Sequence, residues 1–141
     1  MEALKDYLDI AVFTVLGLMS IAAIGVGIER IGFYKKIDIA MFKSKKELEL
    51  VLGNNLTVIS TIASNAPYVG LLGTVFGIIL TFYTIGTNGM VDTNAIMMGL
   101  ALALKATAFG LLVAIPALIF HNYLVRKMEV LITLWEIRNG D

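Results

Sequence analysis

Three long apolar runs, separated by polar segments, dominate the chain. The runs cover residues 10–28, 56–86 and 94–122, and the second lies within a stretch from Leu50 to Val91 that has no charged residue. A helix rises about 1.5 Å per residue, so each run can cross a hydrocarbon core of about 30 Å. The pattern therefore predicts an all-α integral membrane protein with three transmembrane helices.

The charges between these runs predict the orientation of the helices. Six basic residues lie in the short segment between Glu29 and Glu49, whereas residues 87–93 contain one acid and no Lys or Arg. Loops that are rich in Lys and Arg stay in the cytoplasm. The N-terminus is then outside, and its acidic start before a long apolar run indicates a retained helix rather than a cleaved signal peptide.

These runs and charges predict a single domain (1–141) whose second and third helices are long and extend into the cytoplasm. Ser44 and Glu47 have the spacing of a capping box, so a short helix is expected to begin there, and Gly53 to Asn55 is expected to break it. The expected segments are an outer N-terminus (1–9), a first transmembrane helix (10–28), a cytoplasmic loop (29–55), a second helix with a cytoplasmic extension (56–86), an outer loop (87–93), a third helix (94–122) and a cytoplasmic helical tail (123–141).

One face of the second helix carries only small or polar residues, although the helix as a whole is apolar. The positions alternate steps of three and four residues, as one helical face does. They are Ser60, Ala63, Pro67, Gly70, Thr74, Gly77, Thr81, Thr84 and Asn88. In lipid, a polar face must contact protein or water, so this small-residue stripe is expected to line a conduit or to pack on a partner.

The third helix has a ladder of small residues with the same spacing, formed by Gly99, Ala103, Ala106, Gly110, Ala114 and Ala117. Such ladders let two helix backbones approach closely, so the second and third helices are expected to stand side by side. Gly70 and Gly77 are candidate pore-lining residues, and close helix approach is their alternative role. Three helices cannot enclose a pore, so a conduit would need several copies, most simply a cyclic homo-oligomer.

Two prolines and two threonines relate the second helix to the third. Pro67 and Pro116, which are candidate kink positions, lie near the cytoplasmic ends of their helices. Thr74 is seven residues outward from Pro67 and Thr107 is nine residues outward from Pro116, so the threonines are expected at nearly the same depth. Together with Thr81 they are candidate proton-pathway residues. The alternative is that each hydroxyl bonds only a carbonyl of its own helix, four residues earlier.

Lys105 is the only formal charge between Thr93 and Val125, near the middle of the third helix. A charge at that depth costs at least about 2.5–3.5 kcal/mol, so a partner is expected, and a carboxylate from another subunit is favoured over snorkelling to the interface. At about 100° per residue, Lys105 points about 160° away from Thr107, so both side chains cannot face one narrow lumen.

Composition excludes several function classes. The mean hydropathy is +0.85, 16% of the 141 residues are charged and the net charge is zero, which favours a membrane protein and gives no indication of nucleic-acid binding. There is no cysteine, no phosphate-binding loop, no cluster of metal-ligating residues and no nucleophile–base pair. No enzyme activity, cofactor or metal is therefore expected. His121 is a candidate proton relay, but a solvated or hydrogen-bonded interfacial histidine is the preferred interpretation.

Two motifs, in this order, resemble the ExbB/TolQ/MotA family of proton-channel subunits. The second helix contains APYVGLLGTVFGI at 66–78, which is similar to the family pattern APxxGLLGTVxGI. The third contains ATAFGLLVAIPA at 106–117, which is similar to ATAxGLLxAIPA. The resemblance is specific over these two helices and covers the rest of the chain only through its layout, in which the ExbB and TolQ branches fit best.

The resemblance implies a function and a set of partners. It implies a pentamer in the bacterial inner membrane, with a periplasmic N-terminus and a cytoplasmic C-terminus, around a proton path. It also implies an ExbD-like single-span subunit whose aspartate carries the proton, and a TonB-like protein that uses the proton motive force to energise outer-membrane import. Thr74 and Thr107 match the family's pore threonines.

One position departs from the family pattern. Relatives usually have a glutamate five residues before the threonine of the third helix, where this chain has Leu102, with Lys105 one turn further on. The hypothesis is that the essential carboxylate belongs wholly to the partner, and that Lys105 pairs with it or with an interface. The lack of acids within the helices also argues against a self-contained sodium site.

Three alternatives remain open at this point. One is a TolQ-type subunit of the Tol-Pal envelope system, and another is a flagellar-type stator, although stator relatives carry a large cytoplasmic domain that residues 29–55 are too short to supply. The third is a non-conducting membrane scaffold in which the small-residue stripe only packs.

Overall fold

The computed structural model describes residues 2–89 and 92–140. Its elements are α1 (Glu2–Lys36), the short 3-10 helix η1 (Ile39–Met41), α2 (Lys45–Gly53), α3 (Leu56–Asn88) and α4 (Thr93–Asn139). Three of them, α1, α3 and α4, are long and apolar enough to cross a membrane. The expectation of an all-α chain with three such helices is confirmed.

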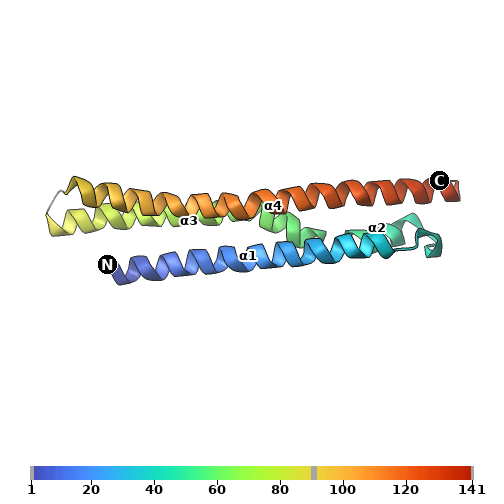
Figure 1. The fold of residues 1–141 in the computed structure, drawn as a ribbon, viewed down its shortest axis with the longest axis horizontal. Helices are drawn as coiled ribbons and strands as arrows, with labels where there is room; N and C mark the ends of the chain where they lie inside the picture. Colours follow the sequence, from blue (N-terminus) through green and yellow to red (C-terminus); the bar gives the residue numbers. More distant parts are fainter. Residues whose placement is uncertain (1, 90–91, 141) are drawn as a thin grey trace.

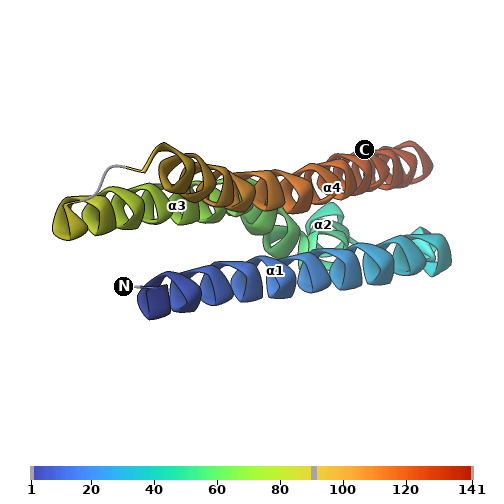
Figure 2. The same cartoon turned by 60° about the vertical axis from the view of Figure 1, so that its left-hand side comes forward.

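The long helices form an elongated bundle (Figure 1). α3 and α4 make an antiparallel hairpin and pack on each other along most of α3, while α1 lies against both. We call the end with the α3–α4 connection the loop end. The opposite end, where α2 lies beside the C-terminal half of α4, is called the α2 end (Figure 2).

α1 corrects one sequence-based boundary. Residues 29–36, which were expected to belong to a loop, continue α1 by about two turns. The extension depends on tertiary contacts. Arg30 and Tyr34 on these turns are buried against α2, and their contacts stabilise the helical conformation. The connection begins only at Ile37, and Asp38 then caps η1 by accepting a hydrogen bond from the Ala40 amide at 3.0 Å.

α2 begins and ends where local sequence signals predict. The Ser44 hydroxyl accepts a hydrogen bond from the Glu47 amide at 3.1 Å, which caps the first turn of the helix. Asn55 adopts φ 67°, in the left-handed region that asparagine tolerates better than most residues, and this turn separates α2 from α3. The predicted break at Gly53 to Asn55 is therefore confirmed.

The α2 end contains the main apolar core. Its fully buried members include Leu48 and Leu52 of α2, Ile59 of α3 and Leu124 of α4. Trp135 closes this core, and its indole N–H donates to the Phe42 carbonyl at 2.9 Å. The C-terminal part of α4 therefore packs on α2 and on the start of α3.

Candidate functional site

The small-residue stripe of α3 packs against the small-residue ladder of α4. A Cβ atom built on Gly70 would lie 2.6 Å from the Ala106 carbonyl oxygen and 3.0 Å from the Gly110 Cα. A Cβ on Gly110 would lie 2.7 Å from the Ala66 carbonyl oxygen. Only hydrogen fits at this crossing, so the two backbones touch. This geometry supports the close-approach role of Gly70, and pore lining stays a prediction.

The contact continues toward the loop end. A Cβ on Gly77 would lie 2.8 Å from the Ala103 Cβ, and a Cβ on Gly99 would lie 2.6 Å from the Thr81 hydroxyl oxygen. Thr81 itself donates to the Gly77 carbonyl at 2.8 Å. From Gly70 to Thr81, the stripe is therefore occupied by α4 of the same chain, as the expectation of adjacent helices implies.

Thr74 and Thr107 join α3 to α4 through their hydroxyl groups. The Thr74 oxygen also lies 2.8 Å from the Ala103 carbonyl on α4 and 3.3 Å from the Gly70 carbonyl of its own helix. The expectation that the two threonines share one depth is confirmed, and the hydroxyl of Thr74 does not bond its own helix alone.

The donors in this group follow from hydrogen-bond chemistry. A threonine hydroxyl has one proton and two lone pairs, so Thr74, when it donates to Ala103, receives the proton of Thr107. Thr74 is only 6% exposed, whereas Thr107 is half-buried. Thr107 is thus the more exposed residue of the pair, and in this arrangement its oxygen keeps lone pairs that can accept a further hydrogen bond.

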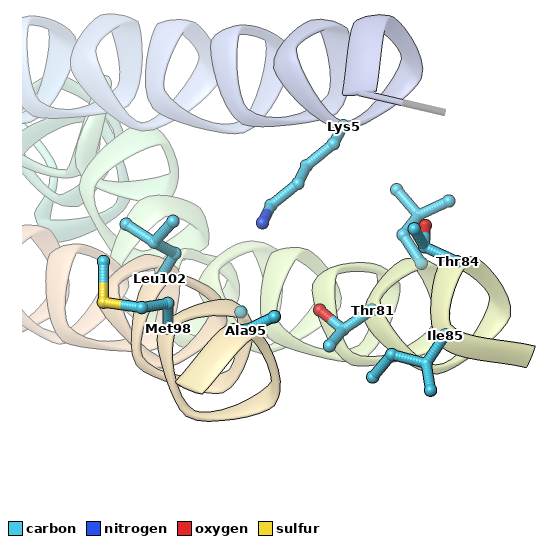
Figure 3. A pocket seen from close by; sticks show the side chains of 9 residues that line it. Lys5, Thr81, Thr84, Ile85, Ala95, Met98 and Leu102 are labelled. Atoms are coloured by element: carbon cyan, nitrogen blue, oxygen red, sulfur yellow. The ribbon is translucent and has the colours of Figure 1, made fainter. Parts of the chain in front are cut away.

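Thr81 borders a cavity of about 210 Å³ at the loop end, between α1, α3 and α4 (Figure 3). Lys5 extends from α1 toward this space, and Thr84 and Leu102 also line it. The volume exceeds the roughly 30 Å³ that one water occupies, and the hydroxyls and the amine can bind water. Leu102, at the position where the family resemblance implies a glutamate, thus lines this cavity with an apolar side chain.

Lys105 lies on the opposite side of α4 from Thr107. Its side chain is exposed, and its Nζ atom lies 6.0 Å from the centre of the Phe13 ring on α1. Phe13 in turn makes an edge-to-face contact with Phe109, with ring centres 4.9 Å apart. The prediction that Lys105 and Thr107 point apart is confirmed, since Thr107 faces Thr74. No acidic group of the described part of the chain forms a salt bridge with Lys105.

Both prolines lie inside continuous helices, Pro67 in α3 and Pro116 in α4. Because proline has no N–H, the carbonyls of Ala63 and Leu112, four residues earlier, lose their usual intrahelical donor. A kink at either position stays a prediction. His121 is half-buried on α4.

Two residues at the α2 end escaped the sequence analysis. Arg30 is 4% exposed; it donates to Glu29 at 2.6 and 2.7 Å and to the Val51 carbonyl at 3.0 Å. The Tyr34 hydroxyl donates to the Leu52 carbonyl. Both carbonyls belong to the last turn of α2, where the backbone lacks intrahelical donors. The sequence feature that could have identified this pair is its i, i+4 spacing, which places Arg30 and Tyr34 on one face of α1.

Comparison with known proteins agrees with this architecture. Residues 33–137 match the MotA/TolQ/ExbB proton channel family. Biopolymer transport protein ExbB of Aquifex aeolicus is 52% identical over 141 residues, covering 100% of this chain and 95% of that protein. Biopolymer transport protein ExbB of Helicobacter pylori (strain J99) is 54% identical over 131 residues, covering 93% and 90%. Tol-Pal system protein TolQ of Pseudomonas aeruginosa is 37% identical over 101 residues, covering 72% of this chain and 42% of that protein.

The match spans most of the chain and includes both motif-bearing helices, with their paired threonines and their glycine contacts. The expectation drawn from the two motifs is therefore confirmed. The chain belongs to the MotA/TolQ/ExbB proton channel family and is a multi-pass membrane protein.

Proposed function

We propose that the chain is the ExbB-type channel subunit of an inner-membrane complex that uses the proton motive force to drive import across the outer membrane. The observation that carries the proposal is the hydroxyl pair of Thr74 and Thr107, which joins α3 to α4 within their long apolar runs. Similarity to proteins named ExbB over nearly their whole length supports the ExbB role.

The proton path in this proposal runs beside the α3–α4 contact of each copy in a homopentameric ring. Thr107 faces the lumen, and Thr74 lies behind it, hydrogen-bonded to its hydroxyl group. Gly70 and Gly77 set the distance between the helices, and Thr81 with its cavity gives water a way in from the loop end. The groups of this chain that line the path are hydroxyl groups, and none is a carboxylate.

The proton-carrying acid in this proposal belongs to an ExbD-like single-span partner, and a TonB-like protein receives the mechanical work. The side chain of Thr107 accepts a hydrogen bond from the protonated acid, and it can donate one to the ionised acid only when it releases its hydrogen bond to Thr74. Lys105, on the other side of α4, pairs with an acidic group of a neighbouring subunit, because an unpaired charge at that depth is costly.

The orientation is part of the proposal. The α2 end carries the six basic residues between Glu29 and Glu49, so it lies in the cytoplasm. The N-terminus and the α3–α4 connection then lie in the periplasm. The spans are 10–28, 56–86 and 94–122, and the remaining turns of α1, α3 and α4 stand outside the hydrocarbon core.

Proton flux through the reconstituted complex tests the proposal. Thr107→Val and Thr74→Val keep the side-chain volume and remove the hydroxyl. We expect each to lower the partner-dependent acidification of vesicles by about tenfold, which corresponds to about 1.4 kcal/mol in the barrier. Thr87→Val is the matched control, because Thr87 is exposed and its hydroxyl bonds the Tyr83 and Thr84 carbonyls of its own helix.

Unchanged flux in both threonine variants, with assembly intact, would favour the scaffold interpretation instead. The physiological role is tested by deletion of the gene, which is expected to abolish uptake of iron complexes. Leakage of the envelope with uptake intact would instead indicate a TolQ-type role.

A further inference from the structure

The part of α4 that extends beyond the apolar run 94–122 carries opposite charges on its two flanks. One flank borders a groove of about 250 Å³ between α1 and α4, lined by Lys35 and Lys127 and by Ile31, Val130 and Leu134. The Lys127 Nζ atom lies 5.8 Å from the centre of the Tyr123 ring. No salt bridge among the described residues involves either lysine. We call this surface the basic groove.

The other flank, here called the acidic flank, is formed with α2 and contains Glu49, Glu129 and Glu136 around Met128 and Ile132. Glu136 is already paired with Lys45 at 2.5 Å, and this contact raises the pKa of Lys45. The side chain of Glu129 is 59% exposed, and its pairing with Arg126 is long, at 3.9 Å. Glu129 therefore remains open to a further cation.

The positions of Lys127 and Glu129 on the helix make these flanks complementary between copies. At about 100° per residue, the two side chains point about 160° apart. Along the helix axis they differ by two residues, or about 3 Å. In a ring whose axis runs along the long helices, neighbouring copies meet at equal height, so Lys127 of one copy can reach Glu129 of the next. Such head-to-tail contacts close into a ring when the rotation permits.

Apolar side chains near both flanks also indicate a protein interface. Val130 is 38% exposed and Leu134 is 48% exposed, and both line the basic groove. In the proposed orientation this part of α4 stands in water, where an apolar strip bordered by charges is typical of a protein interface. A second copy fits the strip, because it brings the half-buried Met128 and Ile132, which lie within about 5 Å of Glu129 along the helix axis.

We propose that a head-to-tail contact between copies seats Glu129 and Glu49 of one copy against Lys127 and Lys35 in the basic groove of the next. The contact rests on the homo-oligomer of the proposed function and deepens it. It fixes the ring outside the membrane, at a distance from the Thr74–Thr107 pair, so ring assembly and proton flux are separate readouts.

Cysteine cross-linking tests the contact directly, because the chain has no cysteine of its own. In Lys127→Cys/Glu129→Cys the two side chains of one copy point apart and cannot bridge each other. Oxidation of the membranes should then give a ladder of covalent oligomers. Neither single variant should do so, and neither should the control Lys127→Cys/Asn139→Cys, whose second cysteine lies about 18 Å further along the helix.

Charge exchange tests the same contact without cysteines. Lys127→Glu and Glu129→Lys should each weaken assembly of the purified complex by about tenfold or more, because each places like charges opposite one another. The double exchange Lys127→Glu/Glu129→Lys should restore the oligomer to nearly its original amount. Native mass spectrometry or light scattering gives the oligomeric state of each variant.

Several outcomes would overturn the proposal. A cross-linked dimer from Lys127→Cys alone would show a symmetric contact, because one thiol per copy can join only two copies. An intact oligomer that gives no ladder with the cysteine pair would show that these two flanks do not meet. If the cysteine pair itself prevents assembly, the charge-exchange variants test the contact instead. A double exchange that fails to restore the ring would indicate an anionic lipid or a different chain in the groove. A wild-type chain that is monomeric would contradict the proposed function as well, whereas rings and flux insensitive to every exchange would contradict this contact alone.

Discussion

Gly70 and Gly110 face each other across the contact of α3 and α4 with no side chain between them. A Cβ atom built on either glycine would lie 3.0 Å from the Cα of the other. A real Cβ atom at either position would therefore force the two backbones apart. The crossing fixes the distance at which the hydroxyls of Thr74 and Thr107 can meet, one turn away on each helix.

Gly70→Ala should destabilise the helix hairpin. The new methyl group would meet the Ala106 carbonyl oxygen at 2.6 Å, and backbone cannot rotate away as a side chain can. Overpacking of this kind costs about 1–3 kcal/mol, measurable as a lower free energy of unfolding in detergent. Gly86→Ala in the same helix is the control, since nothing lies within 4 Å of its Cβ position, and it should be neutral or stabilising by up to about 1 kcal/mol. Equal losses in the two variants would contradict the crossing.

The hydroxyl pair should also contribute to stability. Thr74→Val and Thr107→Val, combined in a double-mutant cycle, should give a coupling free energy of about 0.6 kcal/mol and at most about 1.7 kcal/mol, as for other hydrogen bonds within membranes. Thr74→Val should be the more costly single change, because it also leaves the Ala103 carbonyl without this donor. Strictly additive effects would mean that the two hydroxyls do not interact.

Lys105→Met should lower proton conduction without destabilising the subunit. The isolated subunit should be no less stable, because no salt bridge among the described residues involves Lys105 and the Phe13 ring lies 6.0 Å from its Nζ atom. Removal of the charge also eases placement of this helix in lipid. Partner-dependent proton leak in vesicles should fall, since the acidic group of the neighbouring subunit would lose the lysine that pairs with it. Lys46→Met, an exposed lysine in α2, is the matched control. The idea fails if leak and assembly both match the wild type.

Trp135→Phe should loosen the α2 end without affecting the membrane helices. The change removes the 2.9 Å hydrogen bond to the Phe42 carbonyl and should cost about 1 kcal/mol, while Trp135→Ala should cost about 3–5 kcal/mol. Proteolysis within residues 37–44 reports the loosening. Tyr7→Phe, at a 73% exposed aromatic residue, should leave the cleavage rate unchanged. Equal cleavage of the wild type and Trp135→Phe would show that the indole does not hold this connection.

Much of the fold follows from local signals in the sequence. The three apolar runs identify α1, α3 and α4 because a membrane helix must satisfy its own backbone and bury apolar side chains in lipid. Counting residues from Pro67 and Pro116 was enough to place Thr74 level with Thr107, because helix rise is constant. The capping signal of Ser44 likewise found the start of α2.

Other features depended on contacts between distant segments. The sequence could not say whether the small-residue stripe faces water or protein, since both environments accept glycine and threonine, and only the structure shows α4 against it. The extension of α1 to Lys36 also had no local signal. It follows from Arg30 and Tyr34, which bind the carbonyls of Val51 and Leu52.

The sequence by itself determined the class, the number of spans, the family and the depth of the two threonines, because periodicity, composition and helix rise are properties of one segment at a time. The tertiary structure alone decided which faces meet. It made Thr107 the more exposed residue of the hydroxyl pair, and it placed Lys127 beside α1 and Glu129 beside α2. These relationships depend on how far apart α1, α2, α3 and α4 stand, and helix spacing is set by packing between segments.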